Sequence, residues 1–502
     1  MEAAARAQPV PAGPVYSRRE PEKTALFQVL QRHLLTFEQE WTDKSDGRTL
    51  PGFVTDELHD FMGCGILARG FAQLLCKTCH ERYVVAWSCK GRGFCPSCGG
   101  RRMNAGALTL VDHVLPDTPI RHWVLTMPFP LRFPLAFDGA LLGQVLRIFT
   151  DTVTRWYRQR QADRGLPGGQ CGSITAIHRA SSDLRCDPHF HCLFLDGVYA
   201  PDADGKGQMF HPAPAPTQQD VEQVVERASK RILRFLQRRA VITLVTAPGD
   251  GEVTVVTDET MGDKDPLLAR LLAAATAGAS PAGPAHKRAP VRIVLDPDAT
   301  PVAKGKLCGQ HAGFNLQAAT KVAANDKKGR ENLCKYILRP PFANDRLKIL
   351  DDGTVRLELK RPWSDGTSSV DLAPLALIAR LAALVPPPRR HVVRYSGVIS
   401  SHSSLRSQVV PVPPAATPEG KDKPSLPLSH YISWSELLRR TFEIDTVCPA
   451  CKSPLRLIAM IETEDTIKKI LSAMGLPTEA PKLCPARPPP SESVGEGEDW
   501  MN

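Results

Sequence analysis

The feature that most constrains this chain is a group of cysteines between residues 76 and 98. Cys76 and Cys79 form one C-x-x-C pair, Cys95 and Cys98 form another, and fifteen residues separate the pairs. Two such pairs can place four thiolates tetrahedrally around one Zn²⁺ ion, and the paired spacing disfavours four unrelated buried thiols. The sequence therefore predicts a small module that folds around a structural zinc.

Other potential metal ligands lie near these pairs and close to the C-terminus. Three could replace a ligand or contribute to a second site: Cys64, His80 and Cys89. Cys448 and Cys451 form a further C-x-x-C pair before the apolar run LRLIAMI. This pair predicts half of a second metal site, which Cys484 or His430 could complete.

Length and charge limit the class of protein. The chain has 502 residues, so two to four domains are expected. Lys and Arg number 63 against 53 Asp and Glu, a net charge of +10, which suits a polyanion partner but also fits an ordinary solvated surface. No apolar stretch approaches the roughly 18 residues of a membrane span, and no export signal is visible. We expect a cytoplasmic protein that does not associate with membranes.

The pattern of apolar residues predicts an α+β fold. Strands are expected at 121–127, 173–179, 189–195 and 240–246, and helices at 141–160, 219–239, 327–339 and 372–384. The predicted order is an N-terminal extension (1–44), a zinc-binding domain (45–115), a catalytic domain (116–345) and a mixed C-terminal region (346–502). The low-complexity segment 271–290 and a tail of roughly 25 residues are expected to lack regular structure, and Pro-rich linkers are expected at 386–388 and 411–428.

A histidine pair lies on one predicted strand. In the run CDPHFHCLFLDGVY, alternation sends His189 and His191 to the same face, where they can share a divalent ion. A His-x-His pair alone is often incidental. A third ligand is expected from the preceding strand, with His178 the first candidate and Asp183 and Asp187 the alternatives.

A tyrosine on the predicted helix 327–339 is the candidate nucleophile. Tyr336 lies beside the apolar stripe of NDKKGRENLCKYILRPP, and Lys335 and Arg339 share the last turn before two prolines end the helix. Nearby cations and a metal favour the phenolate form. Without the histidine strand, a tyrosine at the edge of the core would be the default interpretation.

Basic and aromatic residues are candidate contacts to nucleic acid. The basic candidates are Arg92, Arg101, Arg102, Lys335 and Arg339. The aromatic candidates for stacking on bases are Trp123, Trp156 and Tyr157. Solvated basic faces and core aromatics are the simpler alternatives.

Three runs in order, SCKGRGFCPSCGGRRM, PHFHCLFLDGVY and LCKYILRPP, resemble the insertion-sequence-ninety-one and common-region type transposases. These belong to the His-hydrophobic-His endonucleases, and the resemblance covers about residues 45–345. It implies an antiparallel-sheet nuclease domain in which His189 and His191 bind Mg²⁺ or Mn²⁺ and Tyr336 is the nucleophile. It also implies zinc at Cys76 and Cys79 together with Cys95 and Cys98.

The resemblance implies a rolling-circle transposase. Such an enzyme nicks and rejoins single-stranded DNA at the ends of a mobile element and at its target through a 5′-phosphotyrosine, with a host helicase or replication machinery as partner. Founding members carry two tyrosines four residues apart, whereas this chain has Asn332 and Pro340 at those positions around Tyr336. Two alternatives remain open, a plasmid replication initiator or relaxase, and a zinc-dependent DNA-binding regulator without catalysis.

Overall fold

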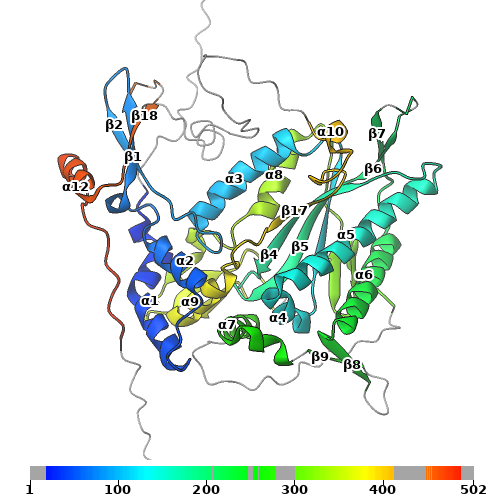
Figure 1. Cartoon of the computed structure of the whole chain (residues 1–502), viewed down its shortest axis with the longest axis horizontal. Helices are drawn as coiled ribbons and strands as arrows, with labels where there is room; N and C mark the ends of the chain where they lie inside the picture. The colour runs from blue at the N-terminus through cyan, green and yellow to red at the C-terminus, as the bar shows by residue number, and fades with distance from the viewer. Residues whose placement is uncertain are drawn as a thin grey trace, which may run out of the picture.

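A computed structural model describes residues 19–487, except 203, 206, 247–252, 258, 279–299, 364, 412–447, 449, 452 and 454. Figure 1 shows the predicted α+β arrangement, in which a large sheet carries helices on both faces and a smaller sheet lies to one side. His430 and the linker expected at 411–428 fall almost entirely outside the described residues. Within the described part of the chain, no helix is both long and apolar enough to cross a membrane.

The large sheet is antiparallel, with the strand order β10-β11-β12-β3-β5-β4-β17, and β13 also pairs with β3. The histidine-bearing strand β5 therefore lies near the middle, between β3 and β4. The strands are β3 (Ile120–Thr126), β4 (Gly172–Ala180), β5 (Cys186–Leu195), β10 (Val302–Gly305), β11 (Cys308–His311), β12 (Phe314–Gln317), β13 (Lys321–Val322) and β17 (Val393–Gly397).

Alternation along β5 determines what each face of the sheet contacts. Phe190 and Phe194 pack into the core formed with α4 (Phe129–Phe137), α5 (Gly139–Ala162) and α6 (Gln218–Arg238). Leu193 and Leu195 point the other way, against α3 (Pro96–His113) and α8 (Lys327–Leu338). His191 follows the same alternation as these leucines, so the histidine face is the one that α3 and α8 cover.

A buried charge network fixes the end of β5. Asp196 is fully buried and accepts two hydrogen bonds from the Arg121 guanidinium on β3, at 2.9 and 3.1 Å. It also accepts a bond from Tyr157 Oη on α5 at 2.9 Å and pairs with Lys321 on β13 at 3.0 Å. The Asp196 carboxylate, directly after β5, thus links the end of that strand to β3, β13 and α5.

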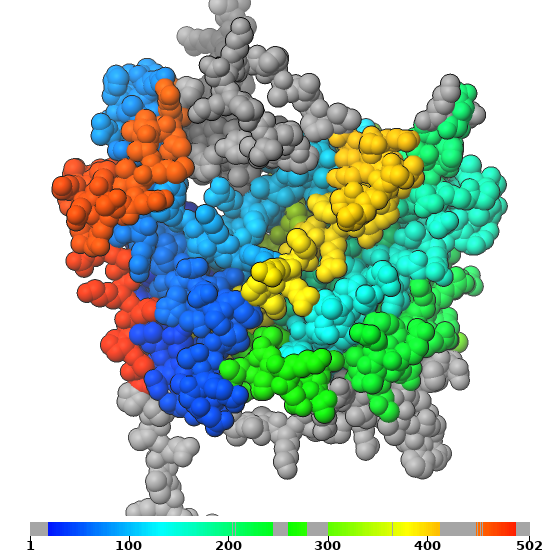
Figure 2. Space-filling view, viewed as in Figure 1, coloured from blue at the N-terminus to red at the C-terminus, as the bar shows by residue number. Residues whose placement is uncertain are grey.

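The small sheet and a helical cluster form the N-terminal side of the molecule. The sheet has the order β18-β1-β2 and contains β1 (Phe71–Cys76), β2 (Arg82–Ala86) and β18 (Leu455–Ile461). The helical cluster has a core of its own, in which α1 (Ala25–Asp43), α2 (Gly52–Met62), α7 (Pro266–Ala277) and α9 (Pro374–Leu384) take part. Residues beyond 345 therefore supply strands to both sheets, and in Figure 2 the C-terminal segment lies over the N-terminal one.

The remaining elements are short or peripheral: β6 (Gly197–Pro201), β7 (Gln208–Pro212), β8 (Ile242–Thr246), β9 (Val253–Thr257), β14 (Leu347–Ile349), β15 (Val355–Glu358), β16 (Ser369–Leu372), α10 (Arg406–Val409) and α12 (Glu464–Ala473), with 3₁₀ turns at Pro21–Lys23, Leu67–Arg69, Glu259–Lys264 and Asn344–Arg346. The expectation that 271–290 lacks regular structure is wrong at its start. Leu271, Leu272 and Ala275 are buried in α7, because apolar residues at helical spacing pack against α4 and α9. Residues 279–299 lie outside the described ones.

Candidate active site and cysteine clusters

Three histidines converge on the α3/α8 face of the large sheet. His178 on β4 is directly opposite His189 on β5 in the strand register, and His191 follows two residues later. One ring nitrogen from each of the three lies within 4.8 Å of those of the other two. The structure thus brings together the predicted pair and the first candidate for the third position.

Backbone carbonyls select the nitrogen that two of these rings present. His189 Nδ1 lies 2.7 Å from the Asp187 carbonyl oxygen, and His178 Nε2 lies 2.6 Å from the Ile337 carbonyl oxygen. Since a carbonyl only accepts, each of these nitrogens carries the proton and donates it. His189 Nε2 and His178 Nδ1 therefore keep free lone pairs, which is the state that a metal ligand requires.

The third ring is oriented by a fourth histidine that the sequence interpretation missed. His122 on β3 places its Nε2 2.9 Å from His191 Nδ1, and the two rings stack with centroids 5.1 Å apart. His191 Nε2 is buried and has no hydrogen-bond partner among the described residues. An unpartnered buried nitrogen facing two other free ring nitrogens fits a bound divalent cation.

Burial keeps these histidines neutral. It lowers the pKa of His178 to about 3 and that of His122 to about 4, with the positive charge of Arg339 acting in the same direction. Burial also lowers the pKa of His189 and of His191. Neutral imidazole is the form that coordinates metal ions.

The acidic alternatives for the third position lie elsewhere. Asp183 is paired with Arg185 at 2.6 Å, and Asp187 is paired with Arg132 at 3.0 Å. Neither carboxylate belongs to the group of converging ligand atoms. Each instead helps to hold the loop or strand end beside the histidines.

Tyr336 faces the histidines from α8. The residue is 44% exposed, and its ring centroid lies 5.6 Å from that of His191 and 5.8 Å from that of His122. The guanidinium carbon of Arg339 lies 4.1 Å from the tyrosine ring centroid, a cation–π contact. Lys335 pairs with Glu331 one turn earlier, at 2.6 Å. Arg339 is therefore the cation of this helix that contacts the tyrosine.

A second tyrosine near the site, Tyr395, makes no ring contact with the histidines among the described residues. Tyr395 sits on the edge strand β17, opposite Ile174 of β4. Its side chain is 40% exposed and lines the cavity described below. Within the part of the chain that the structure describes, Tyr336 is therefore the phenol at the histidine cluster.

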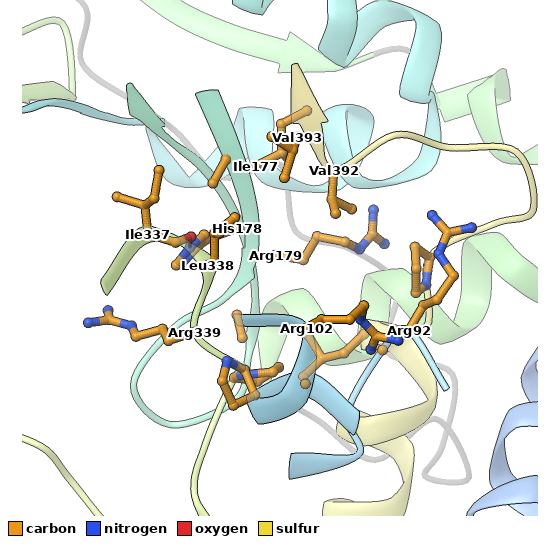
Figure 3. Close-up of a pocket in the computed structure, with 18 of the residues that line it drawn as sticks. Arg92, Arg102, Ile177, His178, Arg179, Ile337, Leu338, Arg339, Val392 and Val393 are labelled. Carbon is orange, nitrogen blue, oxygen red and sulfur yellow. Dashed lines mark hydrogen bonds between the residues drawn. The ribbon is translucent and has the colours of Figure 1, made fainter. Parts of the chain in front are cut away.

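A cavity of about 770 Å³ opens beside His178 and His189, between the sheet, α3 and the segment that follows α8. Figure 3 shows arginines from several elements around it. Among the described residues that line it, the cations are Arg92, Arg102, Arg179, Arg339, Arg346 and Lys360, and the one carboxylate is Asp187. Burial and the neighbouring arginines lower the pKa of Lys360 to about 8. This concentration of positive charge suits a polyanion.

Three of the predicted DNA contacts lie at this cavity and two do not. Arg92, Arg102 and Arg339 line it, although Arg92 also donates to the Arg390 carbonyl and Arg102 to the Lys90 carbonyl. Arg101 is exposed on α3 outside the lining, and Lys335 is in its ion pair with Glu331.

The aromatic residues expected to stack on bases are core residues instead. Trp123 and Tyr157 are fully buried, and Trp156 is 7% exposed. All three pack against one another between the sheet and α5, on the face opposite the histidines. The core alternative is therefore the correct one for these three candidates, because their side chains fill the space between the sheet and the helix.

The cysteines form two clusters, as the sequence predicts, but the ligands are grouped differently from the prediction. The first contains Cys64, Cys89, Cys95 and Cys98, with sulfur–sulfur distances of 3.7 Å (64–95), 3.8 Å (64–98) and 3.5 Å (89–98). Four sulfurs placed tetrahedrally about 2.3 Å from a zinc ion lie about 3.8 Å apart. The donor set and spacing of this cluster therefore fit structural Zn²⁺.

The second cluster combines cysteines from the N-terminal and the C-terminal parts of the chain. It contains Cys76 and Cys79 with Cys448 and Cys451. The prediction of one site from residues 76, 79, 95 and 98 is wrong in its grouping, because β1 carries the first pair away from the start of α3, where the second pair lies. Neither His80 nor Cys484 belongs to a cluster found among the described residues.

Two family models match the chain. One is described as "Transposase zinc-binding domain" and matches residues 32–127, and the other is described as "Putative transposase" and matches residues 172–406. The transposase for insertion sequence element IS801 from Pseudomonas savastanoi pv. phaseolicola is 22% identical over 375 residues, which cover 74% of this chain and 76% of that protein. No solved structure matches the chain.

These matches define the class of protein as a transposase with an N-terminal zinc-binding domain. Within that class, the chain belongs to the insertion-sequence-ninety-one type. The cluster of Cys64, Cys89, Cys95 and Cys98 lies wholly within the residues matched by the zinc-binding model, and its residues would hold the structural Zn²⁺ of that domain.

Proposed function

We propose that this transposase nicks and rejoins single-stranded DNA at the ends of a mobile element through a covalent 5′-phosphotyrosine on Tyr336. The observation that carries the proposal is the arrangement of three convergent histidine nitrogens directly opposite an exposed tyrosine ring. His178, His189 and His191 would hold a divalent cation there.

A divalent ion bound to these histidines would polarise a non-bridging oxygen of the scissile phosphate and neutralise developing charge. Three imidazoles suit Mn²⁺ better than Mg²⁺, which prefers oxygen ligands and keeps its water. His178 also links the ligands to the nucleophile's helix, because it donates to the Ile337 carbonyl, adjacent in sequence to Tyr336. That bond holds α8 in register with the histidines.

Tyr336 supplies the nucleophile. Its oxygen forms a bond to phosphorus while the bond from phosphorus to the 3′ oxygen breaks. The phenol proton passes to solvent and the departing 3′ oxygen takes up a proton. Arg339, stacked on the ring, would contribute positive charge beside the phenolate and the phosphate. One phosphoester replaces another of similar energy, so attack by a new 3′ hydroxyl rejoins the strand without ATP.

The cation-lined cavity supports a nucleic-acid substrate. Its arginines would neutralise phosphates of the strand that enters the site. The single-stranded form of element end and target would come from a host helicase or the replication machinery, and the reaction would take place in the cytoplasm.

The test separates cleavage from binding. His189→Ala and Tyr336→Phe should both abolish nicking of a labelled single-stranded element end in the presence of Mn²⁺, yet bind it with near wild-type affinity because binding depends on the basic cavity. Tyr336→Phe should keep its metal affinity, whereas His189→Ala should lose it. Wild-type nicking by Tyr336→Phe would overturn the assignment, and a protein that never nicks but binds DNA would favour a regulator.

A further inference from the structure

Two matching turns meet at the second cysteine cluster. In the first turn the Cys76 amide donates to the Glu81 carbonyl at 2.9 Å, and in the second the Cys448 amide donates to the Ser453 carbonyl at 2.7 Å. Both bonds therefore span five residues, and each closes a loop that carries a C-x-x-C pair. Two C-x-x-C pairs 372 positions apart in sequence thus each lie in a loop closed by a backbone hydrogen bond of the same span.

The four sulfurs of these turns face one another. Cys76 Sγ lies 3.3 Å from Cys451 Sγ, and Cys79 Sγ lies 3.2 Å from Cys448 Sγ. All four sulfurs are within 4.8 Å of one another, and Cys76 and Cys448 are fully buried. Both of these contacts cross from one turn to the other, so neither turn completes a four-sulfur set alone.

Hydrogen bonds between the turns surround the sulfurs. Thr78 Oγ1 donates to Ser453 Oγ at 2.8 Å, and Tyr83 Oη lies 3.4 Å from Cys448 Sγ. The backbone continues the contact, because Cys76 is paired with Leu455 at the start of β18, which runs antiparallel to β1 as far as Phe71. The C-terminal strand is thus aligned on the N-terminal sheet from the cluster onward.

The apolar core beneath this small sheet is limited. Its buried members are Leu67, Phe71, Val84, Ile467 and Leu471, of which the last two come from α12. On the outer strand β18, by contrast, Leu457, Ile458 and Met460 are between 43% and 64% exposed. A core of this size supplies little of the free energy needed to hold a separate chain segment, so a further link is expected.

We infer that Cys76, Cys79, Cys448 and Cys451 bind a second zinc ion, which fastens the C-terminal residues 448–487 to the N-terminal zinc-binding domain. Four thiolates are the ligand set that selects zinc, and with all four positions filled by protein the ion has no open site for water or substrate. Its role is structural. Only Cys76 and Cys79 of this site lie within the residues matched by the zinc-binding family model, which end at 127, so the model does not contain the complete ligand set.

The test counts zinc in the full-length chain, purified under reducing conditions without chelator. All proteins carry His189→Ala and His191→Ala, so that the histidine cluster does not add a third ion. The parent should contain two zinc ions per chain, and Cys448→Ser with Cys451→Ser should contain one. Cys484→Ser, which alters a cysteine outside both clusters, should keep two. Cys448→His should also keep two, because histidine nitrogen can replace thiolate as a zinc ligand.

Hydrogen exchange measured on the same proteins gives a second readout. Loss of the second ion should speed amide exchange in β18 and α12, while β3, β4 and β5 exchange as in the parent. One zinc ion in the parent, two in the Cys448→Ser and Cys451→Ser protein, or iron in place of zinc would each overturn the inference. So would thiol titration showing these four cysteines oxidised as two disulfides. No outcome depends on DNA cleavage, so failure here is distinguishable from failure of the proposed nuclease activity.

Discussion

His122→Ala tests whether a residue that does not face the metal position supports metal binding. The His122 side chain is 6% exposed, and its Nε2 lies 2.9 Å from His191 Nδ1. For His191 Nε2 to bind a cation, its proton must reside on Nδ1, and His122 Nε2 is the acceptor in reach. Alanine removes that acceptor and the stacked ring that holds the His191 plane.

The expected cost follows from that lost bond. Outer partners of metal-bound histidines typically contribute 10- to 100-fold in affinity, or about 1.4 to 2.7 kcal/mol. A buried Nδ1–H left without an acceptor adds a cost of roughly 1–3 kcal/mol to the folded state. We therefore expect Mn²⁺ affinity to fall 10- to 100-fold and the free energy of unfolding to fall by a few kcal/mol.

The assay is calorimetric titration of Mn²⁺ into folded protein, alongside nicking measured over a range of Mn²⁺ concentrations. His122→Ala should nick at a near wild-type rate once Mn²⁺ is raised to compensate for the lost affinity. His122→Gln, whose amide oxygen can accept from Nδ1–H, should recover most of the affinity. An unchanged Mn²⁺ affinity in folded His122→Ala would falsify the reasoning, since the ring would then be oriented without its partner.

Four further predictions concern the histidine site and the buried charge network at the end of β5. Burial lowers the folded-state pKa of His178 to about 3, well below the ordinary value near 6.5, and lowers the pKa of His189 and of His191 as well, so metal binding displaces few protons from the ligand histidines. Metal affinity should thus stay nearly constant from pH 7.5 to 5.5 in titrations, and a steep fall below pH 6.5 would contradict this. The unfolded histidines do take up protons, so the free energy of unfolding of the metal-free protein should decrease as pH falls from about 6.5 towards 4. His178→Ala should weaken metal binding and regain nicking with excess Mn²⁺ more than with Mg²⁺, and equal rescue by both would argue against a nitrogen-rich site. Asp196→Ala should lower the free energy of unfolding in urea by roughly 3–5 kcal/mol, because it leaves the Arg121 charge buried without a partner, and a loss under about 1 kcal/mol would show that the pair is not structural.

The placement of His189, His191 and Tyr336 on their elements could be predicted because it depends only on residues nearby in the sequence. Side chains alternate along a strand, so His189 and His191 lie on one face in any strand pairing. Pro340 ends the helix of Tyr336 because proline has no backbone N–H to continue it. His122 could not be found in this way, because its place beside His191 depends on the register of β3 against β5. Register follows from packing across strands that are distant in sequence.

The grouping of the cysteines into clusters also depends on contacts between segments that are distant in sequence. The spacing of Cys76 and Cys79 predicts that the two sulfurs act together, and they do, but local spacing cannot identify the second pair that completes their cluster. That partner, Cys448 with Cys451, is brought close only because β18 adds to β1. Likewise, the sequence around Trp123 does not distinguish an aromatic residue in the core from one that stacks on bases.

The most direct test of the central claim is the position and polarity of the covalent bond. The full-length protein is incubated with Mn²⁺ and a single-stranded element end labelled at its 3′ terminus, and the denatured adduct is digested and analysed by mass spectrometry. We predict that the label stays with the protein and that the nucleotide is attached to the peptide containing Tyr336, with no adduct from Tyr336→Phe. Attachment at Tyr395, a protein joined to the 5′ portion of the strand, or cleavage without any adduct would contradict the account.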